Sequence, residues 1–198
     1  MYFDIAICII TYNRGKRALE NVENILQNIK KNFCVLVLNN GSTLGVKEYK
    51  RIEDLSKENS QLFYKRHKTN LQVHGNFRAC FDFNHSKYIM ILSDEDFVNI
   101  DGLDDILNDL KNYNNVAACR TSIEPHKDLV KPGNSYIYPN EYFMAGVSAL
   151  NGFSFFGNYI SGIIYNLELI KKTDLLNILD RHINSHKSYP HLYFDLLV

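Results

Sequence analysis

The chain has 198 residues, of which 45% are hydrophobic and 22% are charged, and its 22 lysines and arginines balance its 22 aspartates and glutamates. This composition indicates one globular domain rather than a disordered chain. The zero formal net charge provides no overall field toward nucleic acid or anionic lipid, so we expect no nucleic-acid partner.

The cysteines and the N-terminus indicate the compartment. The four cysteines lie far apart in apolar segments, which predicts buried thiols in a reducing compartment rather than disulfides or a zinc site. The apolar run 5–10 is too short for a signal peptide or a membrane span, and no basic region precedes it. We therefore expect a soluble, cytoplasmic protein.

Strands and helices alternate along the first part of the chain. Continuous apolar runs predict strands, and apolar residues at helical spacing predict helices. The expected strands are 5–10, 33–38, 62–65, 88–92 and 116–121, and the expected helices are 18–29, 46–55, 75–81 and 103–110. This alternation predicts an α/β fold with a mostly parallel sheet and helices on both faces.

The second part of the chain is less regular. Prolines and glycines mark loops over 122–154, and then a strand at 159–165 and a helix at 167–179 are expected. Pro190 stands where a further helix can begin. The chain ends within an apolar stretch that has no cap, so we expect a chain that is cut short at its C-terminus.

Polar clusters follow three of the predicted strands, at 11–14 (TYNR), 39–43 (NNGST) and 93–96 (SDED). In open α/β sheets the ligand crevice lies at the carboxyl ends of the strands. Three clusters at one edge of the sheet favour a ligand site over ordinary loops.

The third cluster contains Asp94, Glu95 and Asp96 directly after a buried strand. Like charges at the edge of a core repel one another and resist desolvation, unless a cation neutralises them. Mg²⁺ or Mn²⁺ suits such carboxylates and can share them with a diphosphate. A polar loop or the start of the next helix is the alternative. The sequence contains neither of the glycine-rich nucleotide signatures.

The segments IAICIITYNR, VLVLNNGST and GNFRACFDFNHSKYIMILSDED, in this order and spacing, resemble the nucleotide-binding half of the family 2 glycosyltransferases. The resemblance implies a GT-A fold, whose mostly parallel Rossmann-like sheet is flanked by helices. It also implies one domain over 1–198, with a nucleotide-sugar-binding half at 1–121 and an acceptor-side half at 122–198.

The resemblance also implies roles for individual residues. The nucleoside is flanked by the first two clusters, here Thr11, Tyr12, Arg14, Asn39 and Asn40. The acidic cluster binds the ribose and, through Mn²⁺ or Mg²⁺, the diphosphate. We favour Asp96 as the direct metal ligand, Asp94 for the ribose or the metal, and Glu95 as a further metal candidate. Asn76 and Arg78 are additional donor-site candidates, with helix capping and a solvated surface arginine as the alternatives.

The sequence departs from the family pattern at two points. An aspartate often stands at the position of Asn39, which leaves the preferred base open. The family commonly takes its catalytic base from a Glu-Asp pair after the acidic cluster, and this chain has no such pair. His191 and Asp195 lie at about the expected distance and are the candidates for the base. The i, i+4 pair of His182 and His186 is interpreted as surface-exposed.

The function that the resemblance implies is an inverting transfer of a sugar from a nucleotide-sugar donor, with a UDP-sugar preferred, to a saccharide or lipid-linked saccharide. Bacterial surface polysaccharide assembly is the expected context, and peripheral association with the inner face of the membrane stays open. Two alternatives remain: a non-catalytic nucleotide-sugar-binding domain, and a phosphatase or phosphotransferase with Asp94 as its nucleophile.

Overall fold

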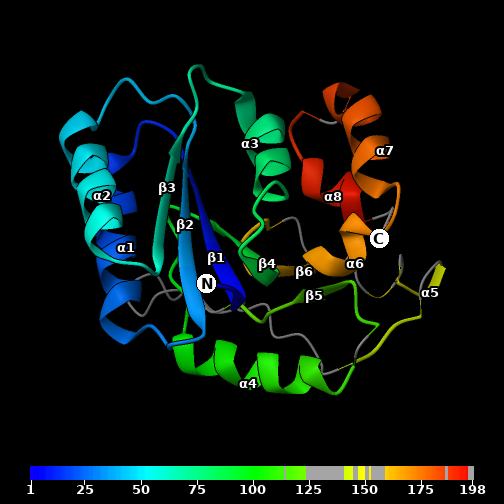
Figure 1. Cartoon of the computed structure of the whole chain (residues 1–198). Coiled ribbons are helices and arrows are strands. Elements are labelled where there is room, and N and C mark those ends of the chain that lie inside the picture. The colour runs from blue at the N-terminus through cyan, green and yellow to red at the C-terminus, as the bar shows by residue number, and fades with distance from the viewer. Residues whose placement is uncertain are drawn as a thin grey trace, which may run out of the picture.

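The computed structural model of the chain describes residues 1–113, 115–123, 141–144, 147–149, 152, 159–185 and 187–195. Within these residues a six-stranded sheet has the order β3-β2-β1-β4-β6-β5 (Figure 1). The strands are β1 (Phe3–Thr11), β2 (Phe33–Asn39), β3 (Leu62–Arg66), β4 (Ser86–Ser93), β5 (Ala118–Arg120) and β6 (Ile163–Asn166). The helices are α1 (Gly15–Asn28), α2 (Val46–Glu58), α3 (Gln72–Cys80), α4 (Ile100–Lys111), α5 (Val147–Ala149), α6 (Leu167–Lys171), α7 (Leu175–His182), the 3-10 helix η3 (Ile183–Ser185) and α8 (Pro190–Asp195).

The first half of the chain forms the parallel part of the sheet. β1 pairs in parallel with β2 and β4, and β2 pairs in parallel with β3, whereas β6 runs antiparallel to β4 and β5. The expected α/β fold with a mostly parallel sheet is confirmed. The register sets Thr11 beside Asn39 and Ile10 beside Ser93. The three polar clusters therefore start from the same edge of the sheet.

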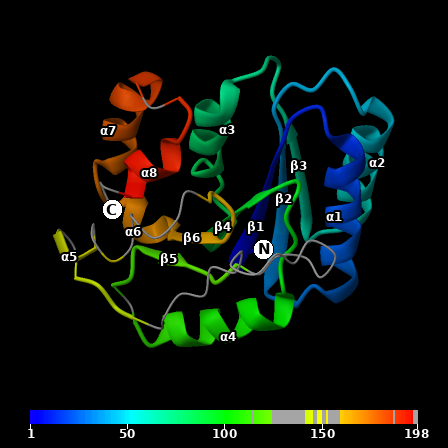
Figure 2. The same cartoon turned by 180° about the vertical axis from the view of Figure 1, so that it is seen from behind.

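Helices cover both faces of the sheet (Figures 1 and 2). Successive side chains of a strand point to opposite faces. Ile5 and Ile7 of β1 contribute to a core that α1, α2 and α4 complete. Ala6 and Cys8 contribute to a second core, which α3, α6, α7 and α8 complete. Because both faces are buried, the parallel strands are continuous apolar runs rather than alternating ones.

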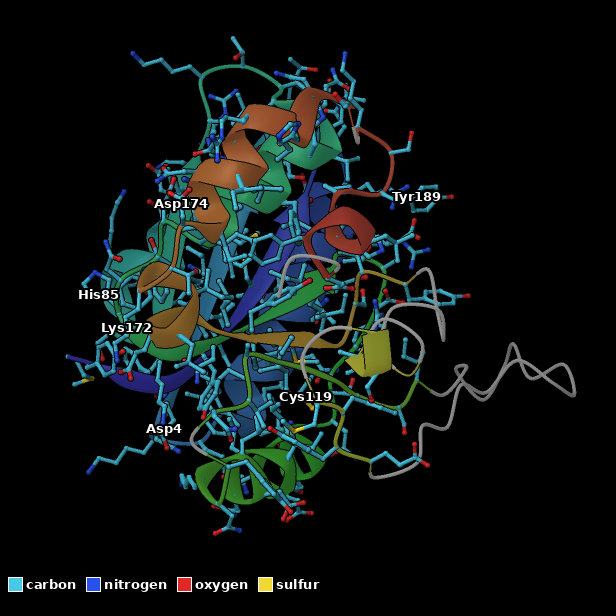
Figure 3. All side chains as sticks on the ribbon, turned by 90° about the vertical axis from the view of Figure 1, so that its right-hand side faces the viewer. Asp4, His85, Cys119, Lys172, Asp174 and Tyr189 are labelled. Atoms are coloured by element: carbon cyan, nitrogen blue, oxygen red, sulfur yellow. The ribbon has the colours of Figure 1, made fainter. Side chains whose placement is uncertain are left out.

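The second half differs in detail from the expected elements. The strand expected at 159–165 is β6, and the helix expected at 167–179 is divided into α6 and α7. The Thr173 hydroxyl donates to the Ile170 carbonyl (2.7 Å), a local bond that competes with the helical pattern. Lys172 and Asp174 of the connecting turn lie on the outside of the molecule (Figure 3).

Helix α3 begins three residues earlier than expected, at Gln72, which has a φ of 61°. A positive φ is uncommon for a residue other than glycine. It is held here because the Gln72 amide donates to Asn70 (2.7 Å) and its carbonyl accepts from Asn40 (3.1 Å). The loop between β3 and α3 is therefore fixed to the end of β2.

The cysteines have no disulfide, in agreement with the sequence-based expectation. Cys8, Cys34 and Cys80 are buried free thiols, and Cys119 is half-buried. Among the described residues, no helix combines the length and the apolar character that crossing a membrane requires.

Candidate functional site

The loops after β1 and β2 are joined by hydrogen bonds at the carboxyl edge of the sheet. The Asn13 side-chain oxygen accepts from the amides of Thr43 (2.8 Å) and Leu44 (3.0 Å), and the Asn13 amide donates to the Ser42 hydroxyl (2.8 Å). Asn13 has a φ of 59°, which asparagine adopts more readily than most residues. The first two polar clusters thus form one connected rim.

Arg14 connects this rim to the acidic cluster after β4. Its Nη1 atom lies 3.3 Å from Asp94 Oδ1 and is also ion-paired with Glu95. Asp94 is buried, whereas the side chains of Arg14 and Glu95 are about half exposed. Two of the three acids therefore already have a cationic partner.

The environment of Asp94 affects its ionisation. Burial raises the pKa of the Asp94 carboxyl, while a hydrogen bond from Thr11 and the positive charge of Arg14 act in the opposite direction. The like charge of Glu95 adds to the increase. Burial has the larger effect, so the pKa of Asp94 is raised, and Thr11 and Arg14 limit the increase.

Tyr49 of α2 supports the same arrangement from below the rim. Its hydroxyl accepts from the Arg14 amide (3.1 Å) and lies 2.7 Å from the Thr11 hydroxyl. The Thr11 hydroxyl also interacts with Asp94 and lowers the pKa of that carboxyl, so Thr11 connects Tyr49 to the acidic cluster. Tyr49 was expected only as an apolar helix position, because helical spacing does not reveal what a hydroxyl contacts.

Asp96 has different partners from the other two acids. The Ser161 hydroxyl donates to Asp96 Oδ2 (2.5 Å), and Asn21 of α1 donates to the Asp96 carbonyl (2.6 Å). Within the described part of the chain, Asp96 Oδ1 accepts no hydrogen bond. Neither Asn21 nor Ser161 was identified from the sequence.

The two asparagines after β2 shape the rim. Asn39 donates to the Tyr64 hydroxyl (2.8 Å) and accepts from the Ser42 amide (2.9 Å). Asn40 donates to Asn70 (2.9 Å) and accepts from the Leu71 amide (2.8 Å). Both are buried. Their expected role in flanking a nucleoside stays a prediction, and Tyr12, which is 42% exposed, is the exposed aromatic side chain of the first cluster.

Asn76 and Arg78 lie on α3 and face other elements. Asn76 donates to the Leu38 carbonyl (3.3 Å), and its oxygen lies 3.2 Å from His67 Nε2. Since α3 begins at Gln72, Asn76 does not cap it, so the capping alternative is wrong.

Arg78 is held by two aspartates. It donates to Asp180 of α7 (2.6 Å) and to Asp82 (2.8 Å). These contacts join α3 to α7, and Arg78 is a partly buried ion-pair residue rather than a freely solvated one.

The two candidates for the base lie on α8. Asp195 accepts from the Tyr165 hydroxyl (2.6 Å) and from Arg120 Nη2 (2.6 Å), so both its oxygens have buried partners. Burial raises the pKa of Asp195 to about 6, although Arg120 and Tyr165 oppose this increase. His191 is 3% exposed and packs edge-on against Tyr189.

Tyr189 precedes α8 and points outward (Figure 3). His186 lies outside the described residues, so the expected surface pair with His182 stays a prediction.

The donor set suits a cation that is shared with a ligand. Within the described residues, no group of three or more His, Cys, Asp or Glu side chains converges as a metal site. Mg²⁺ commonly takes only one or two carboxylates and fills its other positions with water and substrate phosphates. Asp96, with one uncommitted oxygen, fits that requirement, whereas a cation held by protein groups alone does not.

Solved structures with a similar fold come from glycosyltransferases. S. aureus TarS 1-349 in complex with UDP superposes with a TM-score of 0.69 at 16% identity, over 98% of this chain and 54% of that chain. TarS 1-349 in complex with UDP-GlcNAc gives 0.65 at 14% identity, over 87% and 48%. The mannosyltransferase PcManGT from Pyrobaculum calidifontis, in complex with GDP-Man and Mn²⁺, gives 0.58 at 13% identity, over 87% and 47%.

This chain therefore has the GT-A fold, and it spans about half the length of these structures. The family profile described as Glycosyl transferase family 2 matches residues 6–172, so the chain belongs to that family. A search of curated proteins finds no match. The family match does not support the alternative of a phosphatase or phosphotransferase with Asp94 as its nucleophile.

Proposed function

We propose that this protein transfers a sugar from a nucleoside-diphosphate donor to an acceptor hydroxyl with inversion at the anomeric carbon. The observation that carries the proposal is the acidic cluster after β4, held beside the β1 rim through Arg14 in a member of glycosyl transferase family 2. The UDP, UDP-GlcNAc and GDP-Man complexes of proteins with the same fold add support.

In this proposal the three acids have separate roles. Asp96 is the direct ligand of Mn²⁺ or Mg²⁺ through its uncommitted oxygen. Asp94, which Thr11 and Arg14 hold in place, binds the donor ribose. Glu95 is paired with Arg14 and contributes charge at the rim. When bound, the metal neutralises the charge that develops on the departing diphosphate.

The first two clusters enclose the donor. Tyr12 is the exposed aromatic side chain of the rim and is the candidate for contact with the base. Asn39 and Asn40 hold the loops at the positions from which their neighbours reach the nucleoside. A UDP-sugar is the preferred donor class in this proposal.

The acceptor side is assigned to the second half of the chain. A general base takes the proton of the acceptor hydroxyl, which then attacks opposite the diphosphate. His191 is the preferred base, because both carboxylate oxygens of Asp195 are engaged by Arg120 and Tyr165. A saccharide or lipid-linked saccharide acceptor in surface polysaccharide assembly, at the inner face of the membrane, completes the proposal.

A thermal-shift panel tests the donor site. UDP, GDP, CDP and dTDP are each added with and without Mn²⁺, and Mn²⁺ is also tested alone. At 100 times the dissociation constant, a ligand that binds only the folded state stabilises it by about 2.7 kcal/mol. For a chain of this length that corresponds to about 5–10 °C in Tm.

We expect one nucleotide with Mn²⁺ to give a shift of this size, and nucleotide or metal alone to give much less. If none of the four diphosphates shifts Tm, the donor-site proposal is wrong. Donor binding without transfer or donor hydrolysis, measured on the longest native form of the protein, would instead support the non-catalytic alternative.

A further inference from the structure

The hydroxyl of Ser161 bridges two residues of the acidic loop. The Ser93 amide donates to Ser161 Oγ (2.9 Å), and Ser161 Oγ lies 2.5 Å from Asp96 Oδ2. An amide N–H can only donate, so the serine oxygen accepts from Ser93 and its single proton is left for the carboxylate. The direction of both hydrogen bonds is therefore fixed.

The backbone around Ser161 leaves this hydroxyl little freedom. Gly162 has a φ of 81°, its amide donates to the Ile91 carbonyl (2.9 Å), and its carbonyl accepts from the Thr121 amide (3.0 Å). A Cβ at position 162 would lie 2.3 Å from Thr121 Oγ1. The left-handed conformation favours glycine, and a Cβ would in addition displace the Thr121 hydroxyl. Ser161 itself is 7% exposed.

Asp96 is held from both halves of the chain. Asn21 of α1 binds its carbonyl, and Ser161 from the segment before β6 binds its side chain. With the backbone fixed and Oδ2 occupied, the carboxylate has one defined orientation, and Oδ1 remains for another ligand. Asp94 and Glu95 are held differently, through Arg14.

We propose that Ser161 is a positioning residue for Asp96. Its hydroxyl selects the orientation in which Asp96 Oδ1 is available to a diphosphate-bound cation. It also connects the acceptor-side half of the chain to the donor site, since Ser161 belongs to that half and its hydroxyl contacts the Asp96 side chain. This inference rests on the proposed function and deepens it by assigning a residue outside the acidic cluster to the cation site.

The test uses Ser161→Ala and Ser161→Thr, with Ser86→Ala as the matched control. Ser86 is the first residue of β4, and the acidic loop follows the other end of that strand. Ser86 is 2% exposed, and its hydroxyl donates to the Tyr88 carbonyl (2.8 Å). Both alanine variants thus remove one buried hydroxyl and its hydrogen bonds. Isothermal titration with UDP, or with whichever of GDP, CDP and dTDP stabilises the parent most, is carried out at a series of Mn²⁺ concentrations. Electron paramagnetic resonance of Mn²⁺ in the presence of that nucleotide gives the metal affinity directly.

We expect Ser161→Ala to weaken Mn²⁺ binding in the presence of nucleotide by about tenfold or more, since loss of a partner that orients a metal ligand typically costs about 10–100-fold. Metal-free nucleotide binding is expected to stay close to that of the parent. Ser161→Thr retains the hydroxyl and is expected to restore most of the Mn²⁺ affinity. Ser86→Ala is expected to lower Tm without changing the Mn²⁺ affinity.

Parent-like Mn²⁺ affinity in Ser161→Ala, with a loss of Tm like that of Ser86→Ala, overturns the proposal and makes the Ser161 hydroxyl a structural group only. An equal loss of Mn²⁺ affinity in Ser161→Ala and Ser86→Ala also overturns it. A parent protein that binds none of the four diphosphates with Mn²⁺ refutes the proposed function itself, and this inference with it.

Discussion

Arg120 of β5 donates a 2.6 Å hydrogen bond to Asp195 of α8, and the two side chains are 6% and 0% exposed. A second Arg120 nitrogen donates to the Tyr159 carbonyl (3.2 Å), two residues before Ser161. One buried guanidinium thus connects α8 to the segment that reaches the acidic loop. Since removal of one partner of a buried ion pair leaves an uncompensated charge, this pair is a structural link between β5 and α8.

Asp195 gives the protein a pH dependence of predictable sign. Its pKa is about 6 in the folded protein, whereas the ordinary value of an aspartate, which we take for the unfolded chain, is 3.8. The folded state therefore holds the Asp195 proton more tightly, and the associated stabilisation is complete below pH 3.8 and is lost as the pH rises through about 6. The difference between the two pKa values corresponds to about 3 kcal/mol.

We expect the free energy of unfolding of the parent, minus that of Asp195→Asn, to fall by about 2 kcal/mol between pH 4 and pH 7, because at pH 4 the stabilisation is not yet complete. Urea denaturation of both proteins across this range measures it, and the other acids cancel in the subtraction. A difference that rises with pH would mean that pairing with Arg120 outweighs burial.

Arg14 is expected to limit the binding of metal in the absence of a donor, because its positive charge lies against Asp94 and Glu95. Arg14→Met removes this charge and should strengthen the binding of Mn²⁺ alone about fivefold, which corresponds to about 1 kcal/mol for a partly exposed pair. Titration of Mn²⁺ at low ionic strength, followed by paramagnetic resonance, measures the change.

Lys16→Met is the matched control for that experiment. It removes the same charge two residues away, from a side chain that is 83% exposed and paired with Glu20. We expect it to leave Mn²⁺ affinity close to that of the parent. If both variants change the Mn²⁺ affinity equally, the effect comes from the net charge of the protein, and a specific role of Arg14 is contradicted.

Much of the fold and the place of the site follow from local patterns. The runs at β1, β2 and β4 are apolar because helices bury both faces of a parallel sheet, so their strands are predictable from the sequence. Parallel strands also bring their carboxyl ends to one edge. For that reason the clusters that begin with Thr11 and Asn39, and the acidic cluster after Ser93, could be assigned to one rim before the structure was known.

The contacts within the rim could not be predicted in the same way. Asp96 is bound by Asn21 and Ser161, which lie 75 and 65 residues away in the sequence. Asn21 lies in a helix and Ser161 precedes a strand, and nothing in their spacing shows where their side chains are directed. Asn40 likewise matches an ordinary turn sequence, and its role in holding the α3 loop depends on a partner 31 residues away.

The identity of the base is testable by substitution on α8. If His191 takes the acceptor proton, His191→Ala should lower turnover by about 10²–10⁴ while donor binding is retained. If Asp195 is the base, Asp195→Asn gives the large loss instead. The assay belongs in the longest native form of the protein, with the exposed His182→Ala as a control for loss of an imidazole. Near-normal transfer in both α8 variants would place the base elsewhere.

Substitutions of the three acids after β4 should have different effects on nucleotide binding when it is titrated with and without Mn²⁺. Asp96→Asn is expected to abolish the metal-dependent part of binding, because Ser161 fixes Asp96 Oδ2 and Oδ1 accepts no hydrogen bond from the described residues. Asp94→Asn should weaken binding under both conditions, since Asp94 is the proposed ribose ligand and its ion pair with Arg14 depends on its charge. Glu95→Gln should have a small effect, because a half-exposed pair contributes little. If the metal response is lost in Glu95→Gln but intact in Asp96→Asn, the metal ligand is Glu95 rather than Asp96. If all three variants bind as the parent does, the acids form only a polar loop before α4, which begins at Ile100.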